Sequence, residues 1–322
     1  MSPQPAVRHL ILGDGVIGQA VADELARLGE PLALASRHGP KAPPRHAHLR
    51  LDALDAPALR AATQGVTHLY LTVGLPYAAA TWERDWPRVM AHSIEAAQAH
   101  GALLVFFDNL YCYGPPPLAV PMREDHPRRP PSRKGAVRLG LLRQLQRAGE
   151  RDGLRWVVGR SADFYGPGVR SSVLYASAIE RQLRGQRAQW LGDADALHSF
   201  TYTEDAARAL VQLARDAGAW QQEWHLPTAS PAPTPRQLLE LSARLLGAPA
   251  GVQALPAAFV KLLKPFVPIL REYDEMLYQN RHDYVFDSGR FMARHPGFRV
   301  TPYEAGIEAM VASLRASGPP VD

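Results

Sequence analysis

Cysteine is almost missing from this chain of 322 residues, since Cys112 is the only one. A single thiol excludes a disulfide within the chain and most cysteine metal sites, and it is typical of a protein in a reducing compartment. Long hydrophobic runs are also lacking, because no stretch reaches the roughly 20 apolar residues that span a bilayer. Residues 1–15 enter an apolar strand without the pattern of a secretion signal. We therefore expect a cytoplasmic protein with no membrane partner.

Lysine is scarce as well, yet the chain is basic, with a net charge of +5 and a pI near 9.4. Residues 123–155 carry ten basic against four acidic side chains, so the rest of the chain is close to neutral. We interpret this stretch as a loop and a helix with arginines on a solvated face, and an anion-binding surface is the alternative. No aromatic platform or nucleic-acid motif accompanies the charge, so we expect no nucleic-acid partner.

Several catalytic patterns are absent too. The sequence has no plausible metal cluster, no Gly-x-Ser-x-Gly elbow and no phosphate-binding P-loop. His198 and His282 stand alone, and a structural role is favoured over catalysis for both. The apolar fraction of 46% and the charged fraction of 21% are ordinary for a globular protein. We expect a small-molecule substrate and no metal.

The first half of the chain instead alternates apolar strands with amphipathic helices. This pattern predicts an α/β fold of the Rossmann type, a doubly wound parallel sheet assembled by right-handed crossovers. The predicted strands are residues 7–14, 31–36, 67–73, 102–107 and 155–161, and the predicted helices are residues 18–29, 54–63, 82–101 and 135–149. Within the third helix, Pro87 is expected to produce a kink or to mark the true start.

The alternation of apolar strands with amphipathic helices becomes less regular after about residue 165. Thr234 and Pro235 have the pattern of an N-cap and a first helical residue. Residues 255–278 are apolar and interrupted by prolines, which favours short helices over a pocket. We predict a dinucleotide-binding domain over residues 1–165. A smaller substrate-side domain is predicted over 166–322, partly interleaved with the end of the sheet.

The segment after the first strand carries the glycine pattern that supports the dinucleotide prediction. Gly13, Gly15 and Gly18 have G-x-G-x-x-G spacing, with Val16 and Ile17 opening the helix. The first glycine allows a tight turn, the second lets a phosphate approach, and the third lets the helix pack on the strand. The pyrophosphate is then expected on the amino end of that helix.

The end of the second strand bears on which dinucleotide binds. NAD sites usually place an acidic residue there, about 20 residues after the glycines, for the ribose 2′-hydroxyl. Here Ser36 and Arg37 occupy that point. A neutral residue followed by a guanidinium favours NADP, with NAD as the alternative. Asp52 either meets the adenine amino group or caps the following helix.

The stretch "VFFDNLYCYGP" at residues 105–115 begins inside the fourth predicted strand and offers polar side chains just past its end. Asn109 and Tyr111 are candidates for chemistry, and Asp108 is a candidate for orienting them. Packing at a strand end is an equally supported alternative for Tyr111 and the favoured interpretation for Tyr113. Cys112 is interpreted as a small buried apolar residue rather than as a reactive thiol.

Four later segments appear in a characteristic order. They are "YGP" at 113–115, "FYGPG" at 164–168, "LGDADALHSFTYTEDAARAL" at 191–210 and "FDSGRFMARHPGFRVTPYEAGIEAMV" at 286–311. With the glycine motif, they resemble the extended short-chain dehydrogenase/reductase superfamily, in the branch of sugar-nucleotide epimerases and dehydratases, over nearly the whole chain. The resemblance matches Asp205 to the aspartate that follows the substrate loop. It also implies a homodimer through the helix at 135–149.

The chain departs from this superfamily at its catalytic positions. The family uses a tyrosine, a lysine four residues later and an upstream serine or threonine. By the resemblance, Lys134 stands at the tyrosine position, Arg138 at the lysine position and Asn109 at the serine position. This departure resembles the atypical members, which keep the cofactor motif and replace the catalytic residues.

Two classes of function follow from these replacements. The first is an NADP-dependent oxidoreductase acting on a carbonyl or alcohol of a small organic molecule. In it Lys134 or Tyr111 exchanges the proton, Asn109 binds the substrate oxygen and Arg138 holds the nicotinamide ribose. The alternative is a non-catalytic NADP(H)-binding sensor or regulatory protein. Sugar-nucleotide epimerisation or dehydration is less favoured, because the tyrosine is absent.

Overall fold

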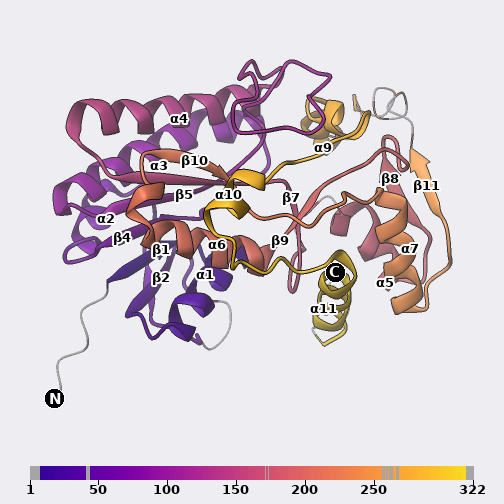
Figure 1. Ribbon diagram of the computed structural model, residues 1–322, viewed down its shortest axis with the longest axis horizontal. Coiled ribbons are helices and arrows are strands. Elements are labelled where there is room, and N and C mark those ends of the chain that lie inside the picture. The colour runs from indigo at the N-terminus through magenta and orange to yellow at the C-terminus, as the bar shows by residue number, and fades with distance from the viewer. Residues whose placement is uncertain are drawn as a thin grey trace. The chain divides into compact units, whose positions relative to one another are not determined.

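The computed structural model describes residues 8–316 except 41–43, 171, 173, 256–257, 259, 261–263 and 266–267. The chain forms two compact units and passes between them repeatedly (Figure 1). Unit 1 comprises Met1–Cys112, Arg133–Arg160 and Ala206–Leu226, and unit 2 comprises Tyr113–Ser132, Ser161–Asp205 and Pro227–Asp322. The second long segment of unit 2 thus starts near the predicted boundary at residue 165, and residues 206–226 then return to unit 1.

Unit 1 contains a seven-stranded sheet with the order β10-β6-β5-β4-β1-β2-β3. Its strands are β1 His9–Leu12, β2 Leu32–Ser36, β3 His48–Arg50, β4 His68–Leu71, β5 Leu103–Asn109, β6 Trp156–Ser161 and β10 Gln222–His225. The pairs β1–β2, β1–β4, β2–β3, β4–β5 and β6–β10 are parallel. The chain moves outward from β1 to β3 and then returns to β4, so the strand order reverses between β1 and β4. The predicted Rossmann-type fold is confirmed.

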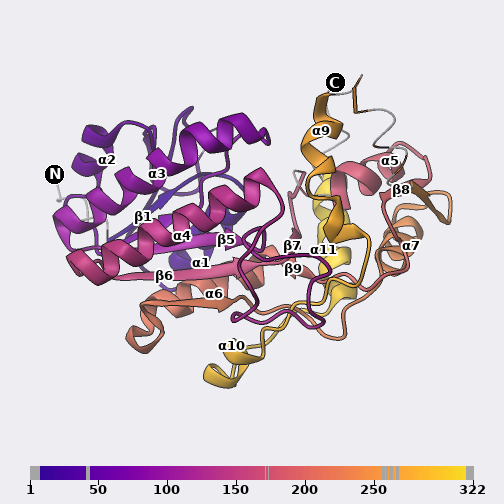
Figure 2. The ribbon, with the colours of Figure 1, turned by 90° about the horizontal axis from the view of Figure 1, so that it is seen from above.

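Helices cover both faces of this sheet (Figures 1 and 2). They are α1 Val16–Arg27, α2 Ala56–Ala62, α3 Ala79–His100, α4 Arg133–Asp152 and α6 Thr203–Arg215, with a 3-10 turn at Ala217–Ala219. Leu59 of α2, Trp86 of α3 and Leu141 of α4 share one apolar core with alternate residues of the strands. On the opposite face, a Cβ on Gly159 of β6 would touch Leu210 of α6. Strands buried on both faces explain the continuous apolar runs in the sequence.

Helix α3 corrects one expectation. It runs unbroken from Ala79 to His100 with Pro87 inside it, so Pro87 does not mark its start. The apolar side chains on either side of the proline, among them Trp82, Trp86 and Met90, are buried. Their burial along one face stabilises the helix enough to offset the hydrogen bond that proline cannot donate.

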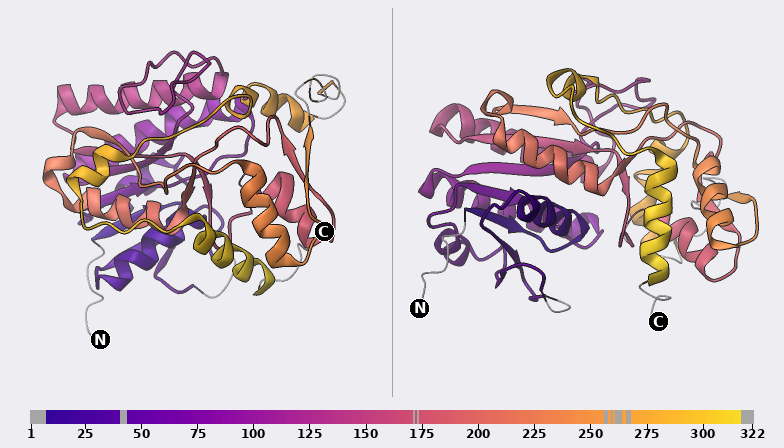
Figure 3. Two further views of the ribbon diagram at one scale, coloured as in Figure 1. Left: turned by 45° about the vertical axis from the view of Figure 1, so that its right-hand side comes forward. Right: turned by 60° about the horizontal axis from the view of Figure 1, so that its bottom comes forward.

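Unit 2 contains two small parallel sheets. In these, β7 Asp163–Tyr165 pairs with β9 Phe200–Tyr202, and β8 Ala188–Leu191 pairs with β11 Val252–Leu255. Its helices are a π-helical Tyr175–Ile179, α5 Glu180–Leu183, α7 Pro235–Leu246, α9 Pro268–Asp274, a 3-10 turn Leu277–Asn280, α10 Gly289–Arg294 and α11 Tyr303–Ala316. Helices α7 and α11 pack against each other (Figure 3).

Two predictions for unit 2 have different outcomes. The cap of α7 is confirmed, because Thr234 and Gln237 form a reciprocal capping box ahead of Pro235. The "FYGPG" segment was expected to be a loop, but Phe164 and Tyr165 belong to β7. Parts of residues 255–278 lie outside the described residues. Within the described part of the chain, no helix is long and apolar enough to cross a membrane.

Candidate functional site

The glycine segment at residues 13–18 joins the end of β1 to the start of α1. Gly13 has a φ of +108°, and a Cβ there would lie 2.7 Å from the backbone oxygen of Thr72. A Cβ on Gly18 would overlap the carbonyl oxygen of Gly13. Gly15 is exposed, and nothing in the described part of the chain lies within 4 Å of where its Cβ would be. Gly13 and Gly18 therefore close the turn, and Gly15 leaves its surface open.

The first turn of α1 follows directly from this open glycine. Gly15 is the N-cap residue and has no side chain that could accept from the first amide groups. Ile17 is buried in unit 1, and Val16 is half-buried. The amide groups of this turn and the positive end of the helix dipole suit an anion such as a pyrophosphate.

A polar cluster lies beside the glycine segment and was not predicted as a unit. The Ser36 hydroxyl at the end of β2 donates to the Asp14 carboxylate at 2.8 Å. The Nε2 atom of His48, from β3, lies 3.2 Å from the Ser36 hydroxyl oxygen. Because Leu12 pairs with Ala35, the register of β1 and β2 brings Asp14 next to Ser36.

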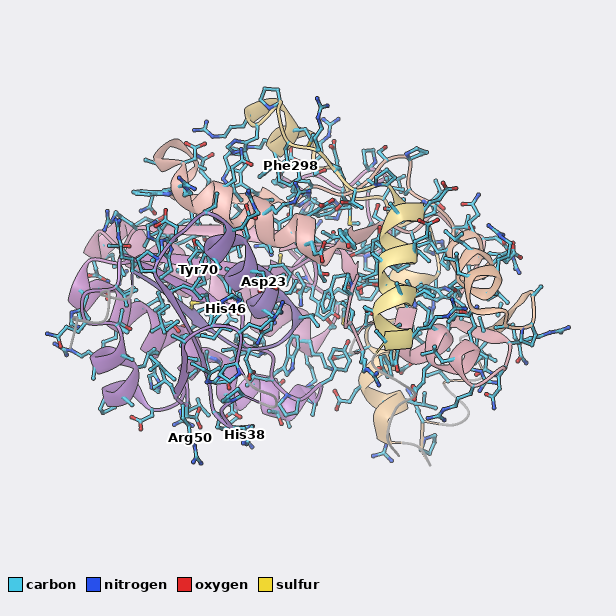
Figure 4. All side chains as sticks on the ribbon, turned by 90° about the horizontal axis from the view of Figure 1, so that it is seen from below. Asp23, His38, His46, Arg50, Tyr70 and Phe298 are labelled. Carbon is cyan, nitrogen blue, oxygen red and sulfur yellow. The ribbon has the colours of Figure 1, made fainter. Side chains whose placement is uncertain are left out.

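Cationic side chains follow the same strand end. Arg37 is exposed, and its Nε donates to His38 at 3.1 Å. Arg50 is also exposed and is the register partner of Ser36 on β3. Figure 4 shows His38 and Arg50 reaching out from the same margin of unit 1. The sequence indicated Arg37 but gave no reason to single out Arg50.

Asp52 follows β3 and makes a local turn. Its Oδ1 accepts from the backbone N–H of Leu54 at 2.9 Å. The helix that follows is capped by Asp55 instead, whose carboxylate accepts from Ala58 at 3.0 Å. Asp52 therefore does not cap α2, and its proposed contact with adenine stays a prediction.

The end of β5 carries the stretch that the sequence singled out. The Asn109 side-chain oxygen accepts from the backbone N–H of Tyr111 at 3.1 Å, which makes a compact turn. The Tyr111 ring stacks on Trp82 with centroids 6.0 Å apart. Its hydroxyl lies 3.5 Å from the hydroxyl of Tyr77. Asn109 thus positions Tyr111 through the backbone.

Lys134 lies in the first turn of α4 and is fully buried. Its ammonium lies 4.5 Å from the centre of the Tyr77 ring, a cation–π distance. The structure therefore brings both Lys134 and Tyr111 to one tyrosine, Tyr77, the first to its ring and the second to its hydroxyl. We call Lys134, Tyr77 and Tyr111 the lysine–tyrosine group.

Arg138 lies about one helical turn after Lys134 and is also buried. Its guanidinium lies 4.2 Å from the ring centre of Trp86 and 4.7 Å from that of Trp82. Its Nη1 is 3.4 Å from the Asp108 carboxylate. Burial lowers the pKa of Arg138, and the Asp108 carboxylate acts in the opposite direction.

Arg160 extends this contact into a chain of buried charges. It is fully buried and donates to Asp108 at 2.6 Å and to Glu223 at 2.5 Å. It also donates to the Asn109 carbonyl and to the Cys112 sulfur, both at 3.0 Å. We call Arg138, Asp108, Arg160 and Glu223 the ion-pair chain. It ties β5, β6, β10 and α4 to the turn that holds Asn109 and Tyr111.

The sequence analysis missed Arg160 and Glu223. Arg160 had one signal, a charged residue inside the otherwise apolar strand "WVVGRS". Charged residues are almost never fully buried unless they are paired, and that rule could have marked Arg160 as a member of a buried pair. Glu223 lies in the polar segment "QEWH" and had no such signal.

Other candidate residues lie in unit 2. Tyr113 is buried against His126, with ring centroids 5.4 Å apart. The Asp205 carboxylate accepts from the backbone N–H of Thr301 at 2.6 Å. His198 lies 3.0 Å from Asp163 and stacks on a buried tyrosine. These contacts are structural in kind.

A parallel sheet whose first strand leads through a glycine turn into a helix defines the class of Rossmann-type dinucleotide-binding folds. The sequence profile of the NAD-dependent epimerase/dehydratase family matches residues 9–224. The chain belongs to that family, and the resemblance noted from the sequence is confirmed. A search among curated proteins finds no match.

Solved structures share the fold. The UDP-glucose 4-epimerase of Thermus thermophilus in complex with NAD has a TM-score of 0.76 and 21% identity, over 97% of this chain and 100% of that one. The UDP-glucose 4-epimerase of Thermotoga maritima with UDP-glucose has a TM-score of 0.77 and 18% identity, over 96% and 99%. The Bordetella bronchiseptica enzyme WbmH in complex with NAD+ has a TM-score of 0.75 and 19% identity, over 96% and 98%. At these identities the likeness shows the fold.

Proposed function

We propose that the chain is an NADP-dependent oxidoreductase that moves hydride to or from a carbonyl or alcohol of a small organic molecule. Family membership and the open glycine turn support a nicotinamide dinucleotide. The observation that carries the proposal is the lysine–tyrosine group. Its buried ammonium lies 4.5 Å from the Tyr77 ring, and the Tyr77 and Tyr111 hydroxyls are 3.5 Å apart.

The side chains divide the work as follows. The nicotinamide supplies or accepts the hydride. Lys134 or Tyr111 gives a proton to the oxygen that becomes an alkoxide, or removes one from the alcohol, and Asn109 binds that oxygen. Arg138 is assigned to the nicotinamide ribose. Because only 6% of this residue is exposed, the contact is limited to an edge of its guanidinium.

The remaining cofactor contacts belong to the segments that follow β1, β2 and β3. The first turn of α1, with Gly15, Val16 and Ile17, would hold the pyrophosphate. Arg37 binds a 2′-phosphate through two N–H groups, which the exposure of this side chain permits. Asp52 accepts from the adenine amino group with the oxygen that Leu54 does not use.

Turnover of a carbonyl panel tests the catalytic proposal. NADPH and the native chain are mixed with aldehydes, ketones and UDP-glucose, and the loss of reduced nicotinamide is followed. Lys134→Met and Tyr111→Phe are expected to lower turnover by about 100-fold with dinucleotide affinity retained. Arg60→Met is the control for the loss of a cation, since its exposed guanidinium pairs with Glu95 on the outer surface of unit 1. Full turnover in both site variants, with native-like thermal unfolding, contradicts the assigned roles.

Binding experiments test the choice of dinucleotide. Arg37→Glu is expected to weaken NADP binding by at least about tenfold and to change NAD binding little, because only NADP carries the 2′-phosphate. Arg244→Glu, at an exposed position of α7, makes the same charge change elsewhere. Equal losses for NAD and NADP in Arg37→Glu refute the phosphate contact.

A non-catalytic NADP(H)-binding sensor is the second candidate. Arg138 favours it, because a guanidinium held on Trp82 and Trp86 and paired with Asp108 is committed to the protein interior. Tight NADPH binding with no turnover by any carbonyl supports this candidate. Sugar-nucleotide epimerisation is weaker, because Lys134 stands at the tyrosine position.

We also propose a cytoplasmic homodimer that packs α4 against its copy. Arg143, Arg147 and Glu150 form part of the exposed face of α4. An antiparallel pair of these helices can place Arg143 of one copy near Glu150 of the other. Light scattering after gel filtration measures the mass, and a monomer at all concentrations contradicts the proposal.

A further inference from the structure

Asp14 lies between the first two glycines of the motif, at a position that the motif leaves open to any residue. Its carboxylate points to the end of β2, where Ser36 donates to its Oδ2 at 2.8 Å. This is the strand end at which NAD sites usually carry an acidic side chain. The carboxylate missing from β2 is therefore present at the same point, supplied by the preceding turn.

His48 sets the direction of this hydrogen bond. Its Nε2 lies 3.2 Å from the Ser36 oxygen and 3.6 Å from Asp14 Oδ2. When Nε2 donates to Ser36, the serine hydrogen is left to point at the carboxylate. The imidazole is almost entirely covered, with 4% of its side chain exposed. The trio is thus a fixed arrangement rather than a set of independent surface groups.

The carboxylate also has the accessibility that a ligand contact requires. The Asp14 side chain is 27% exposed. Among the described residues, Oδ2 takes the Ser36 hydrogen bond and none reaches Oδ1. Gly15, the next residue, borders the open surface proposed for the pyrophosphate. One oxygen is therefore held by the protein, and the partly exposed carboxylate keeps the other for a ligand.

We infer that Asp14 is a specificity-determining residue that accepts from the adenosine ribose hydroxyls and favours NAD against NADP. A carboxylate accepts a 2′-hydroxyl hydrogen bond, and it repels a 2′-phosphate at the same place. This inference rests on the proposed dinucleotide function. It places Asp14 in opposition to Arg37, so that the chain binds both forms and the two residues set the ratio of their affinities.

Binding constants for both dinucleotides in Asp14→Asn test the inference. Asparagine keeps the size of the side chain and an oxygen for the Ser36 hydrogen bond but removes the charge. We expect NAD and NADH to bind about tenfold more weakly and NADP and NADPH to bind as tightly or more tightly. Ser36→Ala is the second variant. Loss of its hydroxyl releases the carboxylate and is expected to shift the ratio of affinities in the same direction by a smaller factor.

Asp23→Asn is the matched control. It removes one carboxylate from α1, which pairs with His46 at 2.6 Å and with Arg45 at 3.0 Å (Figure 4). Its ratio of NAD to NADP affinity is expected to stay native. An unchanged ratio in Asp14→Asn, with both dinucleotides still bound, overturns the role of Asp14 alone. If the native chain binds neither dinucleotide, the proposed function fails as well, so the two failures are distinguishable.

Discussion

Polar side chains lie at both edges of the unit 1 sheet, where its strands begin and where they end. They are charged at the carboxyl edge and neutral at the amino edge. At the carboxyl edge, the ion-pair chain keeps four charged groups in contact, with Arg160 and the Asp108 side chain fully buried. At the amino edge, His9 and His68 stack with centroids 4.6 Å apart, and the ring of Tyr70 lies 5.9 Å from that of His9. We call these three residues the amino-edge cluster.

The difference follows from the balance between burial and opposite charge. At the amino edge the Glu30 carboxylate lies 3.5 Å from His9, and burial outweighs its effect on the pKa of His9. Burial is the main cause that lowers the pKa of His9 and of His68, to about 4 for His68, and burial raises the pKa of Tyr70. These groups are therefore neutral at neutral pH. The carboxyl edge instead alternates guanidinium and carboxylate groups at ion-pair distances of 2.5 to 3.4 Å. A sheet can thus bury charged groups where opposite charges pair with each other. Where such pairing is weaker than the cost of burial, its titratable groups are neutral.

Breaking the ion-pair chain is expected to have the largest effect. Asp108→Ala leaves Arg138 and Arg160 buried beside each other without their shared carboxylate. Removal of one member of a buried pair costs about 3–5 kcal/mol, and we expect this loss in the free energy of unfolding. Urea denaturation at neutral pH measures it.

The double variant Asp108→Leu/Arg160→Met is the control for that prediction. It removes a carboxylate and a guanidinium together, so its loss of stability is expected to be smaller than the sum of the two single changes. Additive losses, or a loss below about 1 kcal/mol in Asp108→Ala, show that the buried charges are not coupled.

The amino-edge cluster predicts a loss of stability in acid. The pKa of His68 falls from 6.5 to about 4 on folding, so the unfolded chain takes up its proton first as the pH drops. Stability from this group is present above pH 6.5, is lost as the pH falls toward about 4, and does not fall further below that. The expected total is about 3 kcal/mol. Urea denaturation at a series of pH values between neutral and acidic follows it.

His68→Phe separates this effect from the titration of carboxylates. Phenylalanine keeps an aromatic ring against His9 and cannot take up a proton, so the variant is expected to lose less stability in acid than the native chain. His9 remains in the variant and contributes in the same direction, since its pKa is also lowered. Parallel pH curves for the two proteins contradict a buried neutral His68.

The two edges also show what the sequence could reveal. The parallel sheet and the glycine turn follow from local patterns, because five apolar strands and Gly13, Gly15 and Gly18 can each be recognised within a few residues. The edge strands β3 and β10 were not among the predicted strands. The ion-pair chain does not follow from local patterns. Arg160 meets Glu223 because β6 pairs with β10, and between these strands the chain passes through residues 161–205 of unit 2. A contact that depends on such a long excursion leaves no local periodicity.

Two glycine substitutions sharpen the contrast at the carboxyl edge. Gly18→Ala forces a Cβ into the carbonyl of Gly13 and is expected to cost about 1–3 kcal/mol of stability. Gly15→Ala meets no described atom within 4 Å, so its stability is expected to stay within about 0.5 kcal/mol of native. Its dinucleotide affinity is expected to fall, because the added methyl group faces the proposed pyrophosphate. Melting temperature and dinucleotide titration measure the two effects. A Gly18→Ala variant with the native melting temperature contradicts the close contact between residues 13 and 18.

The smallest predicted effect comes from a polar contact at the surface of unit 2, which serves as a reference for both edges. Gln237 donates its backbone N–H to the Thr234 hydroxyl at 3.2 Å, and Thr234 donates its own to the Gln237 side chain at 2.8 Å. Thr234→Ala removes one of these bonds from the start of α7 and is expected to cost about 1 kcal/mol. Water can replace the lost partner there, so the cost is expected to be independent of pH and to leave dinucleotide binding unchanged. If Thr234→Ala lowered the free energy of unfolding as much as Asp108→Ala, access to water would not explain why the buried ion-pair chain contributes more stability than this exposed contact.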